Sequence, residues 1–188
     1  VSAVDSDASE DLFITTTDFV TPTRLLLGSA TGTPPTLLKY LPAMYNAKGL
    51  EITQHEAVSK DGTKIPYFQV AKKGVALNGK NPTLLYGYGG FEVSMLPNYN
   101  GIIGNGWLEK GGVYVLANIR GGGEFGPAWH TSVVKENRQR VYEDFSAVAK
   151  ELVARKLTSA EHLGSMGGSN GGLLMGNMMT QYPELFGA

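Results

Sequence analysis

The chain has 188 residues and a net charge of −1; 42% of its residues are hydrophobic, 18% are charged and none is cysteine. This composition is typical of a globular protein and excludes disulfides, thiol catalysis and cysteine–zinc sites. The basic residues are scattered, and no apolar run approaches the roughly 20 residues of a membrane span. We therefore expect neither nucleic acid nor membrane as a partner, and a soluble location in the cytoplasm or the periplasm, between which the sequence does not distinguish.

The first 50 residues contain short runs of the β type. Residues 12–17 and 23–27 are two such runs, and the turn-rich stretch GSATGTPP closes the second. They predict a hairpin-like pair of strands, which cannot bury a core by itself. We therefore interpret residues 1–50 as the tail of a larger β domain together with a linker.

The pattern changes at about residue 51. Alternating runs at 51–59 and 64–73 flank the Asp61-Gly62 dipeptide, which is a hairpin signal. Residues 82–90 and 111–123 are apolar strands that end in glycines, and the second is apolar enough to be covered on both faces.

A helix is predicted over residues 137–156, because five apolar residues recur there at helical spacing: Val141, Phe145, Val148, Ala149 and Leu152. A short strand at 161–167 follows, and then a helix over 171–183 that Pro183 ends. Strands that alternate with helices in this way predict an α/β fold with a parallel sheet over residues 51–188.

One serine lies between two pairs of glycines, where the last predicted strand meets the last helix. Gly167 to Gly171 fit the pattern G-x-S-x-G, and a strand before it with a helix after it is the context of a nucleophile elbow. Such a turn strains the backbone of the serine, so we expect its neighbours to need glycine. The hydroxyl of Ser169 would project above the sheet, and the next amide, at a helix N-terminus, would face a developing oxyanion.

Three other interpretations compete for these glycine-rich stretches. The segment around Ser169 is alternatively a plain turn, since G-x-S-x-G alone occurs often by chance. The segment RGGGEFG at 120–126 fits the dinucleotide pattern G-x-G-x-x-G, but Pro127 follows where the phosphate-binding helix should already run. The segment GVALNGKN at 74–81 is one residue short of a P-loop, and we interpret it as a turn.

Several motifs together resemble one family. YGYGGF at 86–91, ANIRGGGEFGPAWH at 117–130, GGSNGG at 167–172 and the preceding SKDGTKIPYFQVAKKG are similar to the prolyl oligopeptidases. These are serine peptidases of the α/β-hydrolase type whose catalytic domain is capped by a β-propeller. TDFVTPTR resembles the segment that closes the propeller, so the resemblance covers nearly the whole chain. It implies the end of a propeller domain at 1–50 and the first part of a truncated hydrolase domain at 51–188.

The resemblance also implies roles for individual residues. Ser169 matches the nucleophile, the amide of Asn170 matches one oxyanion donor, and the hydroxyl of Tyr88 matches the other. Phe91 matches a residue that lines the proline pocket, and the Asn170 side chain matches a group that helps to hold the peptide. From the residues alone, Tyr88 is as readily an ordinary strand-end aromatic and Phe91 a core residue. The implied partners are short proline-containing peptides, with no metal and no organic cofactor.

A serine nucleophile needs a base and an acid that orients it, and in α/β-hydrolases both follow the serine in the chain. The 19 residues after Ser169 contain no Asp and no His. We therefore expect a fragment of a longer peptidase that is inactive alone and that self-associates through an exposed sheet edge. His130 is expected to be a structural histidine bonded to backbone, and His55 and His162 to be surface or strand-end residues.

The function expected of the parent is hydrolysis of short peptides after proline through an acyl-enzyme on Ser169. An acylaminoacyl or dipeptidyl peptidase of the same superfamily is an alternative within this class. Outside it, a nucleotide-binding oxidoreductase domain and a non-catalytic scaffold stay open. NAD binding would support the former, and a gene without a downstream Asp and His would support the latter.

Overall fold

The computed structural model describes residues 1–188 and divides into two compact units. The first unit combines Val1–Lys48 with Pro97–Gly106, and the second combines Gly49–Leu96 with Trp107–Ala188. The sequence pattern did not indicate that residues 97–106 belong with the N-terminal strands.

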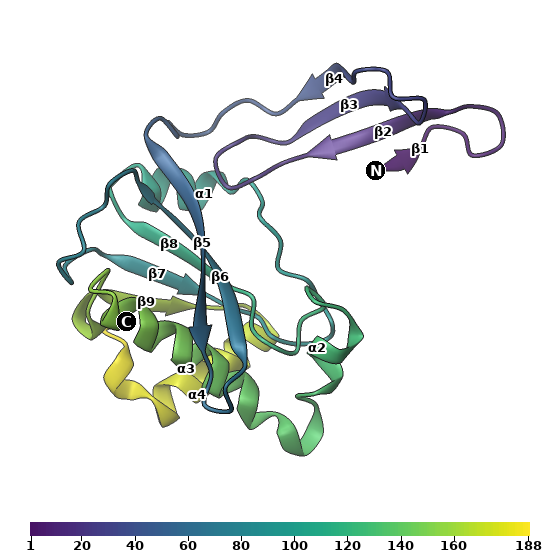
Figure 1. The fold of residues 1–188 in the computed structure, drawn as a ribbon. Coiled ribbons are helices and arrows are strands. Elements are labelled where there is room, and N and C mark those ends of the chain that lie inside the picture. Colours follow the sequence, from purple (N-terminus) through teal and green to yellow (C-terminus); the bar gives the residue numbers. More distant parts are fainter. The chain divides into compact units, whose positions relative to one another are not determined.

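The first unit is built on a four-stranded antiparallel sheet. Its strands follow one another in the order of the chain: β1 (Ser2–Ala3), β2 (Asp11–Thr16), β3 (Arg24–Ser29) and β4 (Thr36–Tyr40) (Figure 1). The predicted hairpin is the pair β2 and β3, in which Asp11 lies opposite Ser29 and Thr16 opposite Arg24. Its existence is confirmed, and its strands differ from the prediction by one or two residues at their ends.

A buried tyrosine holds residues 97–106 within this unit. Tyr45 stacks on Tyr99 with ring centroids 5.0 Å apart, and its hydroxyl donates a hydrogen bond to the carbonyl of Phe19. Burial raises the pKa of Tyr45 to about 12, so its hydroxyl stays protonated. The short helix α1 (Gly101–Ile103), capped by the side chain of Asn100, leads into a π-helical turn at Gly104–Leu108.

The second unit contains a five-stranded mixed sheet in the order β5-β6-β8-β7-β9. The strands are β5 (Leu50–Val58), β6 (Lys64–Lys72), β7 (Thr83–Tyr86), β8 (Val113–Ala117) and β9 (Leu163–Met166). The predicted hairpin around Asp61-Gly62 joins β5 to β6, and Gly62 has a positive φ of 87° as such a turn requires. The last three strands, β8, β7 and β9, are parallel, which confirms the predicted parallel arrangement.

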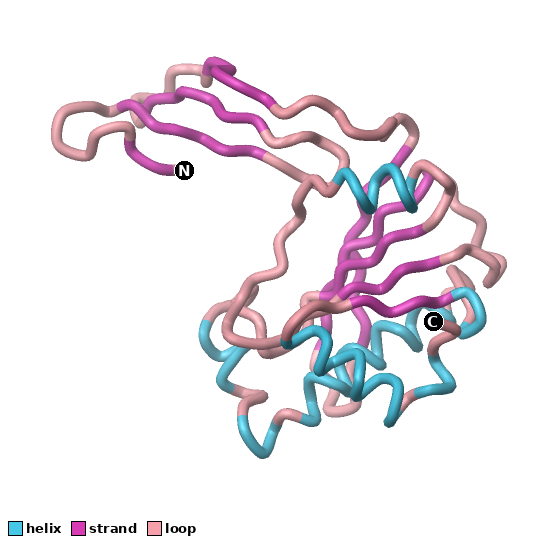
Figure 2. Tube along the Cα trace, turned by 180° about the vertical axis from the view of Figure 1, so that it is seen from behind, coloured by secondary structure: helices cyan, strands magenta, loops and turns pink.

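The helices of this unit are α2 (Pro127–Thr131), α3 (Gln139–Ala154) and α4 (Asn170–Gln181). Short 3-10 turns lie at Lys135–Asn137, Ala160–His162 and Pro183–Leu185. Helices α3 and α4 contact each other and lie on the same side of the sheet, as both ribbon and tube show (Figures 1 and 2). The five residues predicted to form the inner face of α3 are all fully buried in the core, namely Val141, Phe145, Val148, Ala149 and Leu152.

The outer edge of β9 is partly covered by the last residues of the chain. Gly187 donates its amide to the carbonyl of Leu163 over 2.9 Å, and Ser165 donates to the carbonyl of Ala188 over 2.9 Å. Self-association through a sheet edge therefore stays a prediction, with the outer edges of β5 and β4 as the other candidates. None of the helices has the length and apolar character that spanning a bilayer requires.

A buried ionic network joins three parts of the second unit. Arg120 follows β8, and its guanidinium donates to both carboxylate oxygens of Asp144 on α3 over 2.9 and 2.6 Å. It also donates to Asp61 in the β5–β6 turn over 2.6 Å, while the Ser59 hydroxyl donates to Asp144 over 2.6 Å. The Asp144 carboxylate raises the pKa of Arg120, which therefore stays charged. The side chain of Asp144 is 0% exposed, so its charge depends on this partner.

We predict that Arg120→Met lowers the free energy of unfolding by about 3–5 kcal/mol, because Asp144 would be left as an uncompensated buried charge. Lys60 is the matched control: its ion pair with Glu143 is solvent-exposed, and its side chain is 79% exposed. Lys60→Met should change the stability by less than about 1 kcal/mol. Urea unfolding of the three proteins gives both values, and equal small losses would contradict the structural role of Arg120.

The same network predicts a dependence on pH. The hydrogen bond from Arg120 holds the pKa of Asp61 well below its usual value. A carboxylate with a depressed folded-state pKa stabilises the fold above its unfolded pKa, and this contribution is lost as pH falls. The stability difference between the wild type and Asp61→Asn should therefore be full at pH 7 and shrink below about pH 4. A difference that stays constant from pH 7 to pH 2 would show that Asp61 does not titrate with folding.

Candidate active site

Ser169 lies at the turn between β9 and α4. Its backbone has φ 54° and ψ −117°, which is a strained conformation for a residue with a side chain. The residue is exposed, and α4 begins at the next residue, Asn170. A strained, exposed serine directly before a helix is the geometry that the G-x-S-x-G pattern predicts.

Only some of the surrounding glycines are required by the packing. A Cβ on Gly167 would lie 2.6 Å from the carbonyl oxygen of Gly171, and a Cβ on Gly171 would lie 2.7 Å from that of Gly87. A Cβ on Gly168 would meet nothing within 4 Å, and the nearest atom to one on Gly172 would be 3.9 Å away. The expectation that the neighbours of Ser169 need glycine thus holds for Gly167 and Gly171, where backbone meets backbone, and fails for the other two.

The loop that carries Tyr88 lies beside this turn. Strands β7 and β9 are parallel neighbours in which Tyr86 pairs with Met166, so Tyr88 and Ser169 both follow the carboxyl ends of their strands. The Asn170 side chain connects the two segments, since its Nδ2 donates to the carbonyl oxygen of Tyr88 over 2.7 Å. The fold therefore brings the predicted nucleophile and the Tyr88 loop to the same edge of the sheet, where α/β proteins bind ligands.

The first amides of a helix have no partner within that helix, and they lie at its positive end. The amide of Asn170 is the first of α4 and directly follows Ser169. An anion that forms on a group attached to Ser169 would meet this end of the helix. The Asn170 side chain, by contrast, already donates a hydrogen bond to the carbonyl oxygen of Tyr88, so it has less hydrogen-bonding capacity left for a bound peptide.

Arg138 is a neighbour of this site that the sequence did not indicate. Its guanidinium donates to the carbonyl oxygen of Gly89 over 2.7 Å and to Oδ1 of Asn170 over 3.0 Å. The guanidinium carbon lies 5.7 Å from the ring centroid of Tyr142. Arg138 precedes α3, and no motif joins it to Ser169 in the sequence, so only the fold places it here.

Phe91 lies on the surface next to this loop. Its side chain is 75% exposed and its φ is 54°, so it is not a core residue. Two hydrogen bonds hold the loop in place. The Met95 amide donates to the Glu124 carboxylate over 2.9 Å, and the Asn118 side chain donates to the carbonyl of Met95 over 2.8 Å. An exposed aromatic on a fixed loop is free to contact a ligand, although sequence alone could not separate this from core packing.

Two glycines of RGGGEFG, Gly121 and Gly123, serve the same contact between loops. A Cβ on Gly121 would lie 2.3 Å from the carbonyl oxygen of Gly89, and a Cβ on Gly123 would lie 2.3 Å from that of Glu92. The helix that follows, α2, has only five residues and begins with Pro127. Close packing against the Tyr88–Glu92 segment thus explains these glycines without a dinucleotide.

The three histidines are engaged elsewhere. His130 Nδ1 lies 2.8 Å from the carbonyl oxygen of Gly121, which confirms the expected bond to backbone. His55, on β5, lies 2.9 Å from the Thr53 hydroxyl, and burial lowers its pKa. His162 pairs with Ser159 over 2.8 Å and precedes β9, at the opposite end of that strand from Ser169.

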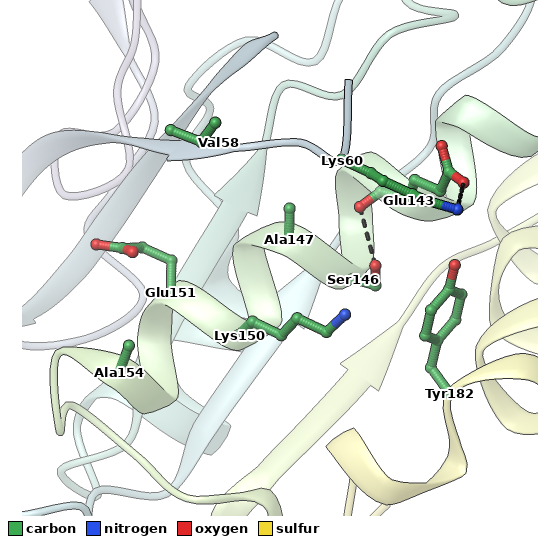
Figure 3. Close-up of a pocket in the computed structure, with 9 residues that line it drawn as sticks. All are labelled: Val58, Lys60, Glu143, Ser146, Ala147, Lys150, Glu151, Ala154 and Tyr182. Atoms are coloured by element: carbon green, nitrogen blue, oxygen red, sulfur yellow. Dashed lines mark hydrogen bonds and ion pairs between the residues drawn. The ribbon is translucent and has the colours of Figure 1, made fainter. Parts of the chain in front are cut away.

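A hollow of about 530 Å³ lies away from this site (Figure 3). Figure 3 shows Lys60 paired with Glu143, which lies on α3, and the ring of Tyr182, which comes from the segment after α4. Tyr182 follows the C-terminal end of α4, whereas Ser169 precedes its N-terminus. Twelve helical residues span about 18 Å, so this hollow does not hold the groups around Ser169. Its lining residues are Val58, Lys60, Glu143, Ser146, Ala147, Lys150, Glu151, Ala154 and Tyr182.

We predict that Gly171→Ala destabilises the protein by about 1–3 kcal/mol, because the new Cβ forces the turn between β9 and α4 away from the Gly87 carbonyl. Gly168→Ala should leave stability within about 0.5 kcal/mol of the wild type, since its Cβ would lie in open space. Thermal or urea unfolding measures both variants. Equal effects at the two positions would mean that the contact between Gly171 and Gly87 does not constrain the turn.

Comparison with known proteins agrees with this geometry. The model of the prolyl oligopeptidase family matches residues 105–188. An uncharacterised peptidase of Sinorhizobium fredii is 55% identical over 182 residues, which cover 97% of this chain and 25% of the relative. A prolyl endopeptidase of Elizabethkingia meningoseptica is 38% identical over 176 residues, which cover 94% of this chain and 25% of that protein.

A solved structure gives the same result. The structure of a post-proline cleaving enzyme from Rickettsia typhi has a TM-score of 0.87 and 47% identity, and the match covers 95% of this chain and 26% of that one. The chain thus spans about a quarter of the length of these relatives. The predicted fold class is confirmed, with closing strands of a propeller before a partial α/β-hydrolase sheet. The chain belongs to the prolyl oligopeptidase family.

Proposed function

We propose that this chain carries the nucleophile and the oxyanion donors of a serine peptidase that hydrolyses short peptides after proline. The observation that carries the proposal is the backbone of Ser169, which is strained at φ 54° between β9 and the N-terminus of α4. A strained serine before a helix is costly, and such strain persists where the reaction uses it. The chain belongs to a family of serine peptidases, and this supports a catalytic role for the serine in this turn.

In the proposed reaction, the hydroxyl oxygen of Ser169 attacks the carbonyl carbon of the scissile peptide bond and loses its proton to a base. The negative charge on the former carbonyl oxygen is stabilised by the amide of Asn170 and the hydroxyl of Tyr88. The C–N bond then breaks, the amine leaves with the proton, and water hydrolyses the acyl-enzyme on Ser169. No metal or organic cofactor takes part in these steps.

Two features support a peptide substrate with proline. Relatives of this chain are named prolyl endopeptidase and post-proline cleaving enzyme. Phe91 offers an exposed aromatic face on the loop that follows Tyr88, and proline is a compact apolar ring that packs well on such a face. We therefore propose that Phe91 lines the pocket for proline and that Asn170 contributes to the site mainly through its backbone.

The base belongs to another part of a longer polypeptide in this proposal. No Asp or His follows Ser169 in the sequence, and the three histidines before it bond to Gly121, Thr53 and Ser159. We propose that residues 1–50 end a propeller domain and residues 51–188 begin the catalytic domain. The chain alone should be inactive, because removal of the base from a serine peptidase costs a factor on the order of 10⁶ in kcat.

The test is labelling with a fluorophosphonate, which reacts with activated serines, followed by intact-mass spectrometry. We expect no adduct on residues 1–188 alone and a single adduct on the longer polypeptide that contains them. Ser169→Ala should abolish the adduct, because it removes the reacting oxygen. Ser165→Ala, in the strand before the turn, is the matched control and should leave labelling unchanged.

Labelling of the longer polypeptide that survives Ser169→Ala would place the nucleophile elsewhere and refute the proposal. An adduct on Ser169 in the isolated chain would instead show that a base within residues 1–188 reaches it. That outcome would refute the expected inactivity while it supports Ser169 as the nucleophile.

A further inference from the structure

Arg138 is placed where a helix does not favour a cation. It immediately precedes α3 and has helical backbone angles, φ −57° and ψ −28°. The N-terminal end of a helix carries a partial positive charge, which repels a guanidinium. The four side-chain ion pairs of the chain do not include Arg138, so no carboxylate offsets this repulsion. Helix stability therefore does not explain an arginine at this position.

The contacts of Arg138 form a closed chain with the candidate active site. One guanidinium nitrogen donates to the carbonyl oxygen of Gly89 over 2.7 Å, and another donates to Oδ1 of Asn170 over 3.0 Å. The side-chain nitrogen Nδ2 of Asn170 in turn donates to the carbonyl oxygen of Tyr88 over 2.7 Å. Tyr88 and Gly89 are consecutive residues. The side chains of Arg138 and Asn170 therefore hold the same short stretch of backbone.

This arrangement holds together the two segments that carry the proposed oxyanion donors. The bond from Arg138 to Oδ1 determines the orientation of the Asn170 side-chain amide. Because of this orientation, Nδ2 faces the Tyr88 loop. The two held carbonyls set the backbone from which the Tyr88 side chain projects. Donors to an oxyanion work only when they stand within a few tenths of an ångström of the right place before the charge develops.

We propose that Arg138 is the positioning residue of the oxyanion hole: it locks the Tyr88 loop against the Asn170 turn so that the Tyr88 hydroxyl and the Asn170 amide converge. The inference rests on the proposed function and adds a residue to it. Arg138 does not touch the substrate in this proposal, and its effect on the reaction passes through Tyr88 and Asn170.

The test uses the longer polypeptide that contains this chain, with a proline-containing peptide as substrate. Arg138→Met keeps the length of the side chain and removes both hydrogen bonds, so we expect kcat to fall about 10- to 100-fold with little change in KM. Arg138→Lys keeps the charge and one donor and should recover part of the loss. Arg140→Met is the matched control, because Arg140 lies two residues further on, is exposed in the first turn of α3, and should retain full kcat when substituted.

Inhibitor binding separates positioning from a general loss of structure. A peptide aldehyde forms a hemiacetal with Ser169 whose oxygen occupies the oxyanion hole, whereas the product acid makes no such bond. Arg138→Met should weaken the binding of the aldehyde by about the factor lost in kcat. It should leave the affinity for the product acid unchanged. Equal weakening of both compounds, with kcat intact, would show a structural role only and overturn the inference.

A double-mutant cycle tests whether Arg138 acts through Tyr88. Tyr88→Phe removes one donor and should itself lower kcat, while Tyr86→Phe in the same motif should not. In the Tyr88→Phe background, Arg138→Met should lower kcat by a smaller factor than in the wild type, because one of the groups it positions is gone. An undiminished effect would overturn the inference, as would wild-type kcat in Arg138→Met.

The failures of the two proposals are distinguishable. Peptidase activity that survives Ser169→Ala refutes the proposed function, whatever Arg138 does. Activity that is lost in Ser169→Ala and kept in Arg138→Met refutes only the role of Arg138. If Arg138→Met does not fold, Arg138→Lys is compared with Arg140→Lys in the same assays, and equal kcat in those two variants refutes the positioning role.

Discussion

The close approach of two backbones, at Gly171 and Gly87, is the constraint on which the candidate site depends. A Cβ at Gly171 would lie 2.7 Å from the Gly87 carbonyl oxygen, so the turn after β9 meets the loop after β7 with no space between them. This contact makes it possible for the Asn170 side chain to reach the Tyr88 carbonyl. The parallel pairing of β7 with β9 brings the two segments to one edge of the sheet, and the glycines let them touch.

The elements of the fold could be predicted from the sequence because their patterns are local. The buried face of α3, the Asp61-Gly62 hairpin and the strand–helix context of Ser169 each follow from periodicity or turn chemistry within about 20 residues. Their ends were less well defined: α4 ends at Gln181, and Pro183 begins a 3-10 turn of its own. The short helix α2 was not predicted, since five residues that include proline, tryptophan and histidine give no periodic signal.

The polar interactions that hold the site could not be predicted in this way. Arg138 lies 32 residues from Asn170 and 49 from Gly89, and Arg120 lies 59 residues from Asp61. A charged residue that precedes or follows a helix or strand looks like an ordinary surface group in the sequence. Only the packing of separate elements turns it into a partner of a buried carboxylate or of a backbone carbonyl. For the same reason, the proposed roles of Tyr88 and Phe91 rest on the family resemblance.

The hydrogen bonds around Asn170 also affect its chemical lifetime. Asn170 precedes glycine, and asparagine before glycine is the pair most prone to deamidation, in which the next backbone nitrogen attacks the side-chain carbonyl carbon. Here the Gly171 amide donates to the Gly168 carbonyl over 2.7 Å, and the Asn170 side chain is held at both ends, by Arg138 and by the Tyr88 carbonyl. Both groups that this reaction would join are thus already engaged in hydrogen bonds, which must break before the nitrogen can reach the carbonyl carbon, so the bonds that shape the site also oppose deamidation.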